Sequence, residues 1–283
     1  MIVSAFLPNS VFILSISLYL SACSTSLPDP FTNSENAAFK TPQTISGKQL
    51  AHLPPPTGKI AVAIYAFSDQ TGQRKDPADG KGGSNSSAVT QGGTAILMQA
   101  LQNSNWFTVL ERKGLADLSK ERNIIRIANN GAQLVPMKNA DLLLEGGITG
   151  YATNTRTGGT GFEYFGMSHA KQYREDFVTV HLRAVDIASG QVVLSVSASR
   201  RLLSKEIRSG VFQYIRFKQL LGVERGITVN EPSHICISDA IEKAVHDLVI
   251  EGILKGTWQL KNKQDINTPS IREYKKARLA ISS

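Results

Sequence analysis

The stretch Lys59–Phe67 reads KIAVAIYAF, and it decides which class of fold the chain adopts. Branched apolar residues alternate with alanine along most of it, so both sides of an extended chain would be apolar. A strand of this kind belongs in the interior of a sheet that helices cover. The stretch therefore predicts a strand buried on both faces in a domain that mixes helices and strands.

Helical and extended patterns follow one another along the rest of the chain. Apolar residues at spacings of three and four predict helices, and alternating runs bounded by turn residues predict strands. We expect an α+β domain, a mixed sheet with flanking helices. The expected helices are 87–103, 114–129 and 232–256, and the expected strands are 106–110, 140–150, 177–187 and 191–199.

Two of the expected helices have an apolar side. In the helix over 114–129, Leu115, Leu118, Ile124, Ile125 and Ala128 lie on one side. In the helix that begins at Pro232 and Ser233, the pattern assigns one side to the core, and that side consists of Ile237, Ile241, Ala244, Val245, Leu248 and Val249.

The beginning of the chain predicts its location. The apolar run Val11–Ala22 ends at Cys23, and it is shorter than the roughly 20 residues that cross a bilayer. Residues 1–22 are therefore predicted to be a signal peptide, although the start lacks the usual Lys or Arg. Small residues just before the cysteine predict that Cys23 is lipidated and begins the mature protein; the alternative is an ordinary secretory signal. Ser24, instead of the aspartate that retains lipoproteins at the inner membrane, indicates the outer membrane.

Composition and charge exclude several classes of protein. The chain is 41% hydrophobic and 19% charged, as globular proteins are. Its net charge of +8 would face lipid headgroups or acidic cargo, because a lipoprotein outside the cytoplasm meets no nucleic acid. A lipidated Cys23 leaves Cys236 without a partner, so no internal disulfide is expected.

Three polar segments lie outside the predicted core. Residues 23–58 are rich in Ser, Thr, Asn and Pro and are predicted to be a tether. Residues 68–87 are polar and contain four glycines, and so long a loop in a compact domain is usually functional or disordered. Residues 264–283 are predicted to be a polar, basic, solvated tail.

Two further segments do not fit a small α/β body. Residues 155–175 and 205–229 are long, contain glycine and aromatic residues, and have no helical period. Each has room for two strands of about 10 residues, the length that crosses a bilayer when tilted. Ordinary surface hairpins or flaps fit the same pattern.

The sequence contains little that predicts catalysis. Ser168 and Lys171 form an SxxK pair, but the motifs that accompany it in serine hydrolases are missing. His234, Cys236 and Asp239 near a helix start are potential metal ligands, yet without a second cluster, packing and capping explain them better. We expect no enzyme, no cofactor and no metal site.

Several short stretches, taken in order and with their spacing, resemble the CsgG family of outer-membrane curli secretion channels. They extend over most of the chain from about residue 48 to 263. The stretches are LPPPTGKI (53–60), DQTGQ (69–73), NWFTVLER (105–112), ERNIIRIA (121–128), LEGGITGY (144–151), YFG (164–166), SGVF (209–212) and NEP (230–232).

The resemblance implies a nonameric pore in the outer membrane, in which each lipid-anchored subunit contributes two transmembrane hairpins to one large barrel. Nine subunits with four strands each would give about 36 strands, the largest count known. The hairpins correspond to 155–175 and 205–229, and the periplasmic domain to 59–154, 176–204 and 230–263. The implied partners are unfolded curli-type subunits as cargo, periplasmic and surface accessory proteins, and outer-membrane lipids, with no nucleic acid and no ATP.

The resemblance also implies that a loop from each periplasmic domain narrows the channel. The family lines this constriction with tyrosine, asparagine and phenylalanine, whereas the corresponding residues 75–87 contain only Asn85, flanked by Ser84 and Ser86, and no Tyr or Phe. We therefore expect a wider, wetter or more mobile constriction. The alternative functions are an outer-membrane scaffolding lipoprotein that forms no pore and, more remotely, a hydrolase that uses Ser168 and Lys171.

Overall fold

The computed structural model describes residues 43–72, 89–158, 171–208, 211–215, 228–229 and 232–282. The helices in these ranges are α1 (Ile45–Ala51), α2 (Gly93–Asn103), α3 (Leu115–Ala128), α4 (Pro232–Leu254), the 3-10 helix η1 (Lys263–Asn267) and α5 (Pro269–Ser282). The strands are β1 (Ile60–Ile64), β2 (Phe67–Asp69), β3 (Phe107–Glu111), β4 (Leu142–Gly158), β5 (Lys171–Asp186), β6 (Val192–Arg208), β7 (Val211–Ile215) and β8 (Thr228–Val229).

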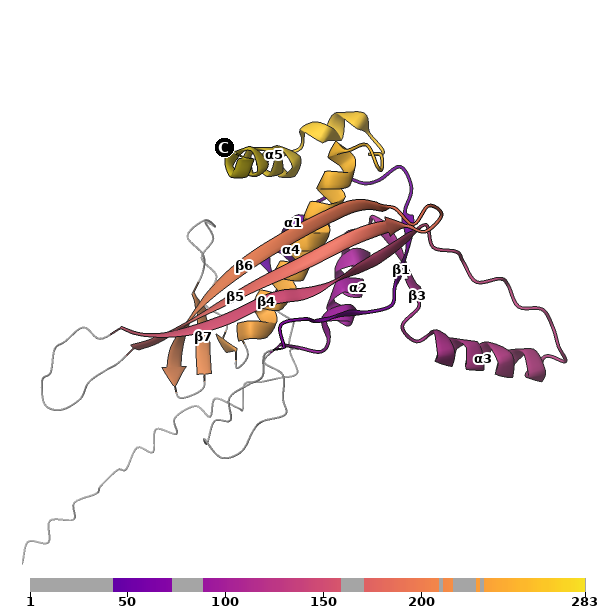
Figure 1. Cartoon of the computed structure of the whole chain (residues 1–283), viewed down its shortest axis with the longest axis horizontal. Coiled ribbons are helices and arrows are strands. Elements are labelled where there is room, and N and C mark those ends of the chain that lie inside the picture. Colours follow the sequence, from indigo (N-terminus) through magenta and orange to yellow (C-terminus); the bar gives the residue numbers. More distant parts are fainter. Residues whose placement is uncertain are drawn as a thin grey trace, which may run out of the picture. The chain divides into compact units, whose positions relative to one another are not determined.

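Within the described residues, eight strands form one mixed sheet (Figure 1). The order is β3-β1-β4-β5-β6-β7-β8, and β2 also pairs with β4. The pairs among β1, β2, β3 and β4 are parallel, and those from β4 to β8 are antiparallel. The predicted α+β class with a mixed sheet and flanking helices is confirmed.

The strand predicted from KIAVAIYAF is β1, which lies between β3 and β4, and it is buried on both sides as expected. Ala61 and Ala63 are 3% and 2% exposed, while Val62 and Ile64 are fully buried. The strand ends at Ile64, Tyr65 is 55% exposed, and Phe67, the last residue of KIAVAIYAF, begins the separate strand β2. Asp141, just before β4, accepts a hydrogen bond from the Ala61 N–H at 3.0 Å and thereby ties the two strands together.

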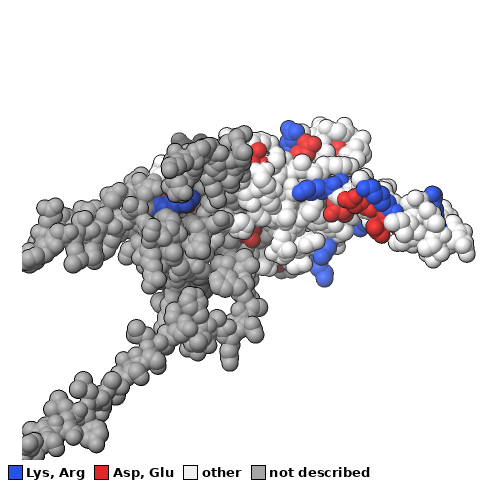
Figure 2. All heavy atoms as spheres, turned by 90° about the horizontal axis from the view of Figure 1, so that it is seen from below, with Lys and Arg blue, Asp and Glu red and all other residues white. Residues whose placement is uncertain are grey.

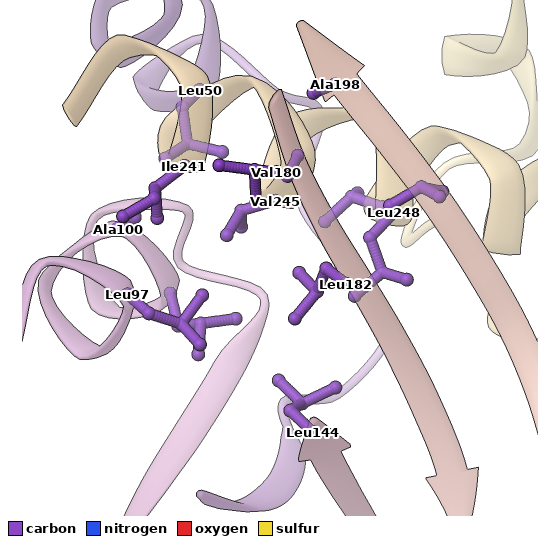
Figure 3. Close-up of a cluster of buried hydrophobic side chains, with 14 of the residues drawn as sticks. Leu50, Leu97, Ala100, Leu144, Val180, Leu182, Ala198, Ile241, Val245 and Leu248 are labelled. Atoms are coloured by element: carbon purple, nitrogen blue, oxygen red, sulfur yellow. The ribbon is translucent and has the colours of Figure 1, made fainter. Parts of the chain in front are cut away.

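The core lies between the sheet and helices α2 and α4 (Figure 3). Each of the six apolar residues predicted for the inner side of α4 is at most 1% exposed, which confirms that prediction. The even-numbered residues of β5, such as Val180 and Leu182, point to the same core, while His181 and Arg183 lie on the other side. Gly256, with a φ of +73°, follows the end of α4, in the left-handed conformation that commonly ends helices.

Helix α1 corrects the prediction that residues 23–58 are tether throughout. Leu50 is fully buried in the core, Thr44 caps the helix by accepting the Gly47 N–H at 2.9 Å, and the Ser46 N–H donates to Asp239 of α4 at 2.8 Å. A seven-residue helix is not stable alone in water. It forms through these contacts with α4, which lies almost 200 residues away in sequence, so local composition could not predict it.

Helix α3 forms where it was predicted, but its apolar side is not in the core. Ile124, Ile125 and Ile127 are 55%, 43% and 68% exposed. None of residues 108–141, all of which the structure describes, is buried. We call residues 112–140 the arm. Inside it, Arg122 donates to the Val135 carbonyl at 2.6 Å and Arg112 to the Lys138 carbonyl at 2.9 Å, so the returning chain is tied to the helical part.

Helix α5 replaces most of the solvated tail predicted for 264–283. Ile271 is fully buried, and the Tyr274 hydroxyl donates to Glu251 of α4 at 2.8 Å. The tail was predicted from its many charges, and the few residues that anchor it were too sparse to form a visible pattern. Among the described residues, no helix is long and apolar enough to cross a membrane.

Candidate functional site

The structure describes the surroundings of the predicted site residues rather than those residues themselves. Cys23, Ser84, Asn85, Ser86 and Ser168 lie outside the described ranges. The described residues show where the predicted constriction loop leaves the domain and where the predicted hairpins leave it.

The predicted constriction loop begins after β2 and returns to α2, and these two elements are fixed to one another. The Thr94 hydroxyl lies 3.0 Å from both the backbone nitrogen and the carbonyl oxygen of Phe67. Gly93 packs so closely on Phe67 that a Cβ atom there would lie 3.2 Å from its carbonyl oxygen. The helix predicted from residue 87 thus begins at Gly93, where the chain has to approach β2. Both ends of the loop start from a rigid base.

The predicted hairpins continue the longest strands of the sheet. Strands β4 and β5 pair without a break from Ala152↔Phe177 to Gly158↔Lys171, across the predicted domain boundary at residues 154–155. Strand β6 pairs with β5 as far as Tyr173↔Lys205 and extends to Arg208. Both described ends of the first predicted hairpin and the beginning of the second are therefore direct extensions of strands that are anchored in the core. The second predicted hairpin ends in the two-residue strand β8, which pairs with β7.

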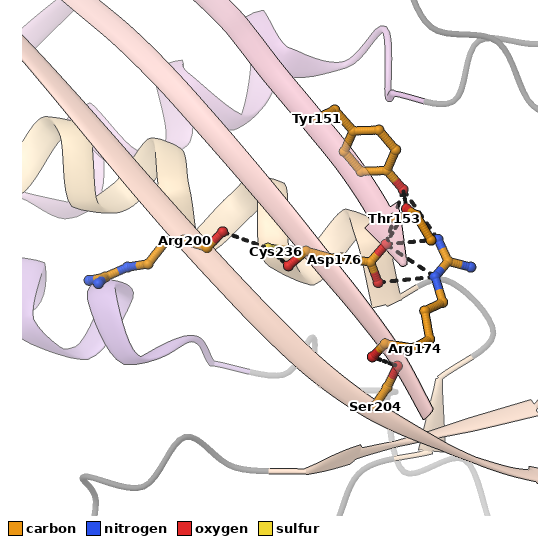
Figure 4. A network of polar contacts seen from close by, with 7 residues as sticks. All are labelled: Tyr151, Thr153, Arg174, Asp176, Arg200, Ser204 and Cys236. Atoms are coloured by element: carbon orange, nitrogen blue, oxygen red, sulfur yellow. Dashed lines mark hydrogen bonds and ion pairs between the residues drawn. The ribbon is translucent and has the colours of Figure 1, made fainter. Parts of the chain in front are cut away.

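A polar network occupies the sheet at this boundary (Figure 4). Asp176 of β5 is fully buried, and the Arg174 guanidinium contacts both of its carboxylate oxygens at 3.0–3.1 Å. The Tyr151 hydroxyl donates to the same carboxylate at 3.1 Å, and the Thr153 hydroxyl lies 2.7 Å from it. Three side chains from two neighbouring strands therefore converge on one carboxylate. We call this set the Asp176 network.

The third strand and helix α4 join the network through backbone oxygens. The Ser204 hydroxyl of β6 donates to the Arg174 carbonyl at 3.3 Å. The Cys236 thiol near the start of α4 lies 3.6 Å from the carbonyl oxygens of Asp176 and Arg200. Burial raises the pKa of this thiol, so Cys236 stays a neutral donor and not a reactive thiolate.

The chemistry of the Asp176 network favours positioning over catalysis. Burial raises the pKa of Tyr151, so its hydroxyl keeps its proton and remains a donor to Asp176. The charges of Arg174 and Asp176 compensate each other, and the side chain of Asp176 has no exposed surface. The network can fix the register and direction of β4, β5 and β6 where they leave the core.

The potential metal ligands near the start of α4 have separate contacts. His234 is exposed, Cys236 is buried against β5 and β6, and Asp239 pairs with Arg200 at 3.0 Å and accepts the Ser46 N–H. In the described part of the chain, no three His, Cys, Asp or Glu side chains lie close enough to hold a metal ion. Of the predicted SxxK pair, only the backbone of Lys171 is described.

The sequence contains a signal for the Asp176 network that its interpretation missed. Asp176 stands in phase with Val178, Val180 and Leu182, the positions of β5 that face the core. A charged residue at a core position requires a partner, and Arg174 two residues earlier has the same phase. Such a pair marks the point where an apolar face becomes polar.

The chain matches one known protein family over most of its length. The family model of the curli production assembly/transport component CsgG matches residues 43–278. The CsgG protein of Salmonella typhimurium is 41% identical over 280 residues, covering 95% of this chain and 97% of that protein. The Escherichia coli K12 protein is 40% identical over 276 residues, covering 94% and 96%. Among solved structures, the lipoprotein GNA1162 from Neisseria meningitidis matches with a TM-score of 0.27 and 16% identity, over 50% of this chain and 82% of that one.

Proposed function

The chain belongs to the CsgG family, and from this premise we propose that it forms an outer-membrane channel that secretes unfolded curli-type subunits. The observation that carries the proposal is the family match over residues 43–278, which includes both predicted hairpins. We propose that 155–175 and 205–229 are the transmembrane hairpins, and that the domain between and around them lies in the periplasm.

The extended strands support this assignment. Strands β4, β5 and β6 are 16 or 17 residues long, about three times an average strand. Their far ends need pairing partners, because an unpaired sheet edge is not tolerated in hydrocarbon. Neighbouring subunits would provide them by closing one barrel, with nine subunits and four strands each.

The arm supports a homo-oligomer. Fully burying each isoleucine side chain of α3 would contribute about 2 kcal/mol, and the arm obtains only part of this within its own chain, where residues 108–141 are all partly or fully exposed. A second copy that covers Ile124 and Ile127 would provide the remaining free energy of burial. Such a contact between two different surfaces of the same chain can close a ring.

Passage through the pore is proposed to be diffusive. Cargo would move through the constriction formed by Ser84, Asn85 and Ser86, whose uncharged hydrogen-bonding groups suit a polar chain that must not bind tightly. Cys23 would hold each subunit at the periplasmic leaflet by its acyl chains while the barrel assembles. Accessory proteins in the periplasm and at the surface would confine the cargo.

The proposal is tested on outer membranes of cells that produce the full-length protein. We expect heat-modifiable oligomers on gels, ring-shaped particles by electron microscopy, and discrete currents in planar bilayers. A monomer in the outer membrane that conducts no current would contradict the pore and favour the alternative, a scaffolding lipoprotein. The Cys23→Ser chain is the control, and we expect it to be soluble and largely unassembled.

A further inference from the structure

The net positive charge of the chain is concentrated near its C-terminus. Residues 255–283 contain seven Lys and Arg against Asp265 and Glu273, a net +5 of the total +8. Six of the seven cations are exposed, namely Lys255, Lys261, Lys263, Arg272, Lys276 and Arg278. On the face shown in Figure 2, by contrast, basic and acidic side chains lie interspersed. Arg278 pairs with Glu251, so we call the other five exposed residues, together with Lys275, the basic surface.

The basic surface is held by the fold and is not a loose tail. Glu251 of α4 is 8% exposed, and it accepts the Tyr274 hydroxyl at 2.8 Å and pairs with Arg278 at 3.0 Å. Ile271 inserts its side chain into the core, and the Lys243 ammonium lies 5.5 Å from the centre of the Tyr274 ring. A buried carboxylate is costly unless it is paired, and here all its described partners belong to α5. Helix α5 therefore presents its lysines from a fixed position.

The basic surface and the Asp176 network lie at opposite ends of α4. Near the start of this helix, Cys236 contacts Asp176, and the 23 residues of α4 span about 35 Å. Just after its end, Trp258 packs on Phe107 with ring centres 6.0 Å apart, where β3 begins. Strand β4 starts near this end as well and runs toward the predicted hairpins. The basic surface thus faces away from the predicted membrane.

We propose that the basic surface is a docking site for an acidic polypeptide segment. Its cations are mostly lysines, whose flexible stems and point charges suit a partner without fixed geometry, and a concentrated charge of one sign speeds the encounter with the opposite sign. A lipid surface fits less well, because a helix that lies in a membrane interface needs a wide apolar face, whereas Ile271 of α5 points into the core. That this end is the entrance of the channel rests on the proposed function.

The test uses the full-length lipoprotein in detergent and a fluorescent peptide of alternating glutamate and glycine. We expect binding by fluorescence anisotropy, with affinity that falls steeply between about 50 and 200 mM salt. The variant Lys261→Glu with Lys263→Glu and Lys276→Glu leaves Ile271, Tyr274 and Arg278 in place, and we expect it to bind at least about tenfold more weakly. The same three lysines changed to glutamine should give an intermediate loss.

The matched control reverses three exposed cations of the arm that do not share the side of α3 formed by Ile124 and Ile127, Lys113→Glu, Arg126→Glu and Lys138→Glu, and we expect it to bind the peptide as the parent does. Equal weakening by both triple variants, or equal binding of a glutamine–glycine peptide, would overturn the inference. So would binding to phosphatidylglycerol vesicles that survives reversal of the basic surface and exceeds peptide binding.

The same preparations separate this inference from the proposed function. If the protein binds the acidic peptide through the basic surface but conducts no current in planar bilayers, the channel is refuted and the docking site stands. If currents appear and the reversed surface still binds the peptide with parental affinity, the docking site alone is refuted.

Discussion

At the scale of single residues, the ion pair between Arg174 and Asp176 makes the sharpest prediction. Removing the guanidinium leaves a fully buried carboxylate with only the hydroxyls of Tyr151 and Thr153 as partners. Breaking a buried pair on one side costs about 3–5 kcal/mol, and the two hydroxyls place the expected loss for Arg174→Ala near the lower end. Urea denaturation of the domain in the Cys23→Ser chain measures it.

Two further variants distinguish charge from packing in this network. Adding Asp176→Asn to Arg174→Ala should recover part of the loss, because the uncompensated charge is gone. Arg201→Ala breaks a pair with Glu175 in which the arginine side chain is 61% exposed, and it should cost less than about 1 kcal/mol. If Arg174→Ala cost no more than Arg201→Ala, the network would not hold the strands as described.

Glu242 predicts how stability depends on pH. Burial against α1 raises the pKa of this carboxyl above its ordinary value of 4.5. The folded state therefore holds the proton more tightly than the unfolded state, so the stabilisation is complete below the unfolded pKa and is lost as pH rises through the folded pKa. We expect Glu242→Gln, which keeps an acceptor for Thr44, to gain stability relative to the parent as pH rises from about 4 to 7.

The denaturation midpoints of the parent and of Glu242→Gln are measured from about pH 4 to 7. Asp186→Asn is the opposite case: hydrogen bonds from Ser189 lower the pKa of this exposed carboxyl, so its folded state favours the charged form. The parent should gain stability over this variant as pH rises from the lowered folded pKa to the ordinary value of 3.8, so for this pair the measurement extends below about pH 4. A Glu242→Gln difference that is constant with pH would mean that its carboxyl is not buried as the structure has it.

At the scale of elements, the arm makes a prediction about assembly. Serine has nearly the helix propensity of isoleucine, so Ile124→Ser with Ile127→Ser should change the stability of the monomeric domain by less than about 0.5 kcal/mol. If another copy covers these side chains, the double variant should lose its oligomers. Size-exclusion chromatography with light scattering measures the outcome. Glu121→Ser with Asn123→Ser alters two exposed polar residues of the same helix and should assemble normally.

The contrast between α3 and α4 shows what periodicity can and cannot predict. Both helices form over nearly the predicted residues, because local spacing and helix ends determine where a helix exists. The apolar side of α4 lies in the core, whereas that of α3 is exposed, since periodicity does not tell whether the covering surface belongs to the same chain. Helix α1 is the converse case, a helix with almost no local pattern that depends on distant residues such as Asp239.

For the strands too, the local pattern predicts which side faces the core but not where each strand ends. The alternation of Val178, Val180 and Leu182 predicted which side of β5 faces the core. The sequence assigns the continuation of β5 back to Lys171, and of β6 forward to Arg208, to separate hairpins, because these belong to long segments that contain glycine and aromatic residues and have no helical period. The structure keeps them in one strand each, because backbone pairing does not depend on side-chain polarity.

At the scale of the whole molecule, β2 and α2 hold both ends of the loop that is proposed to narrow the channel. The loop that contains Ser84, Asn85 and Ser86 starts from β2 and ends at α2, two elements joined through Thr94 and Phe67. Changes within the loop should therefore alter the channel without unfolding the domain. The location of the loop was predicted from resemblance, and its rigid base comes from packing that the sequence does not display.

The missing aromatic residues then predict the size of the current. Nine copies of a loop without Tyr or Phe leave more open area than nine aromatic rings, so single-channel conductance in planar bilayers should exceed that of a relative with an aromatic constriction. Ser84→Tyr should lower the conductance, because it places a ring from every subunit at the narrowest point. Ser119→Tyr, an exposed position on α3, is the matched control and should leave the current unchanged. A parental conductance well below that of the aromatic relative would mean that residues other than Ser84, Asn85 and Ser86 form the narrowest part of the pore.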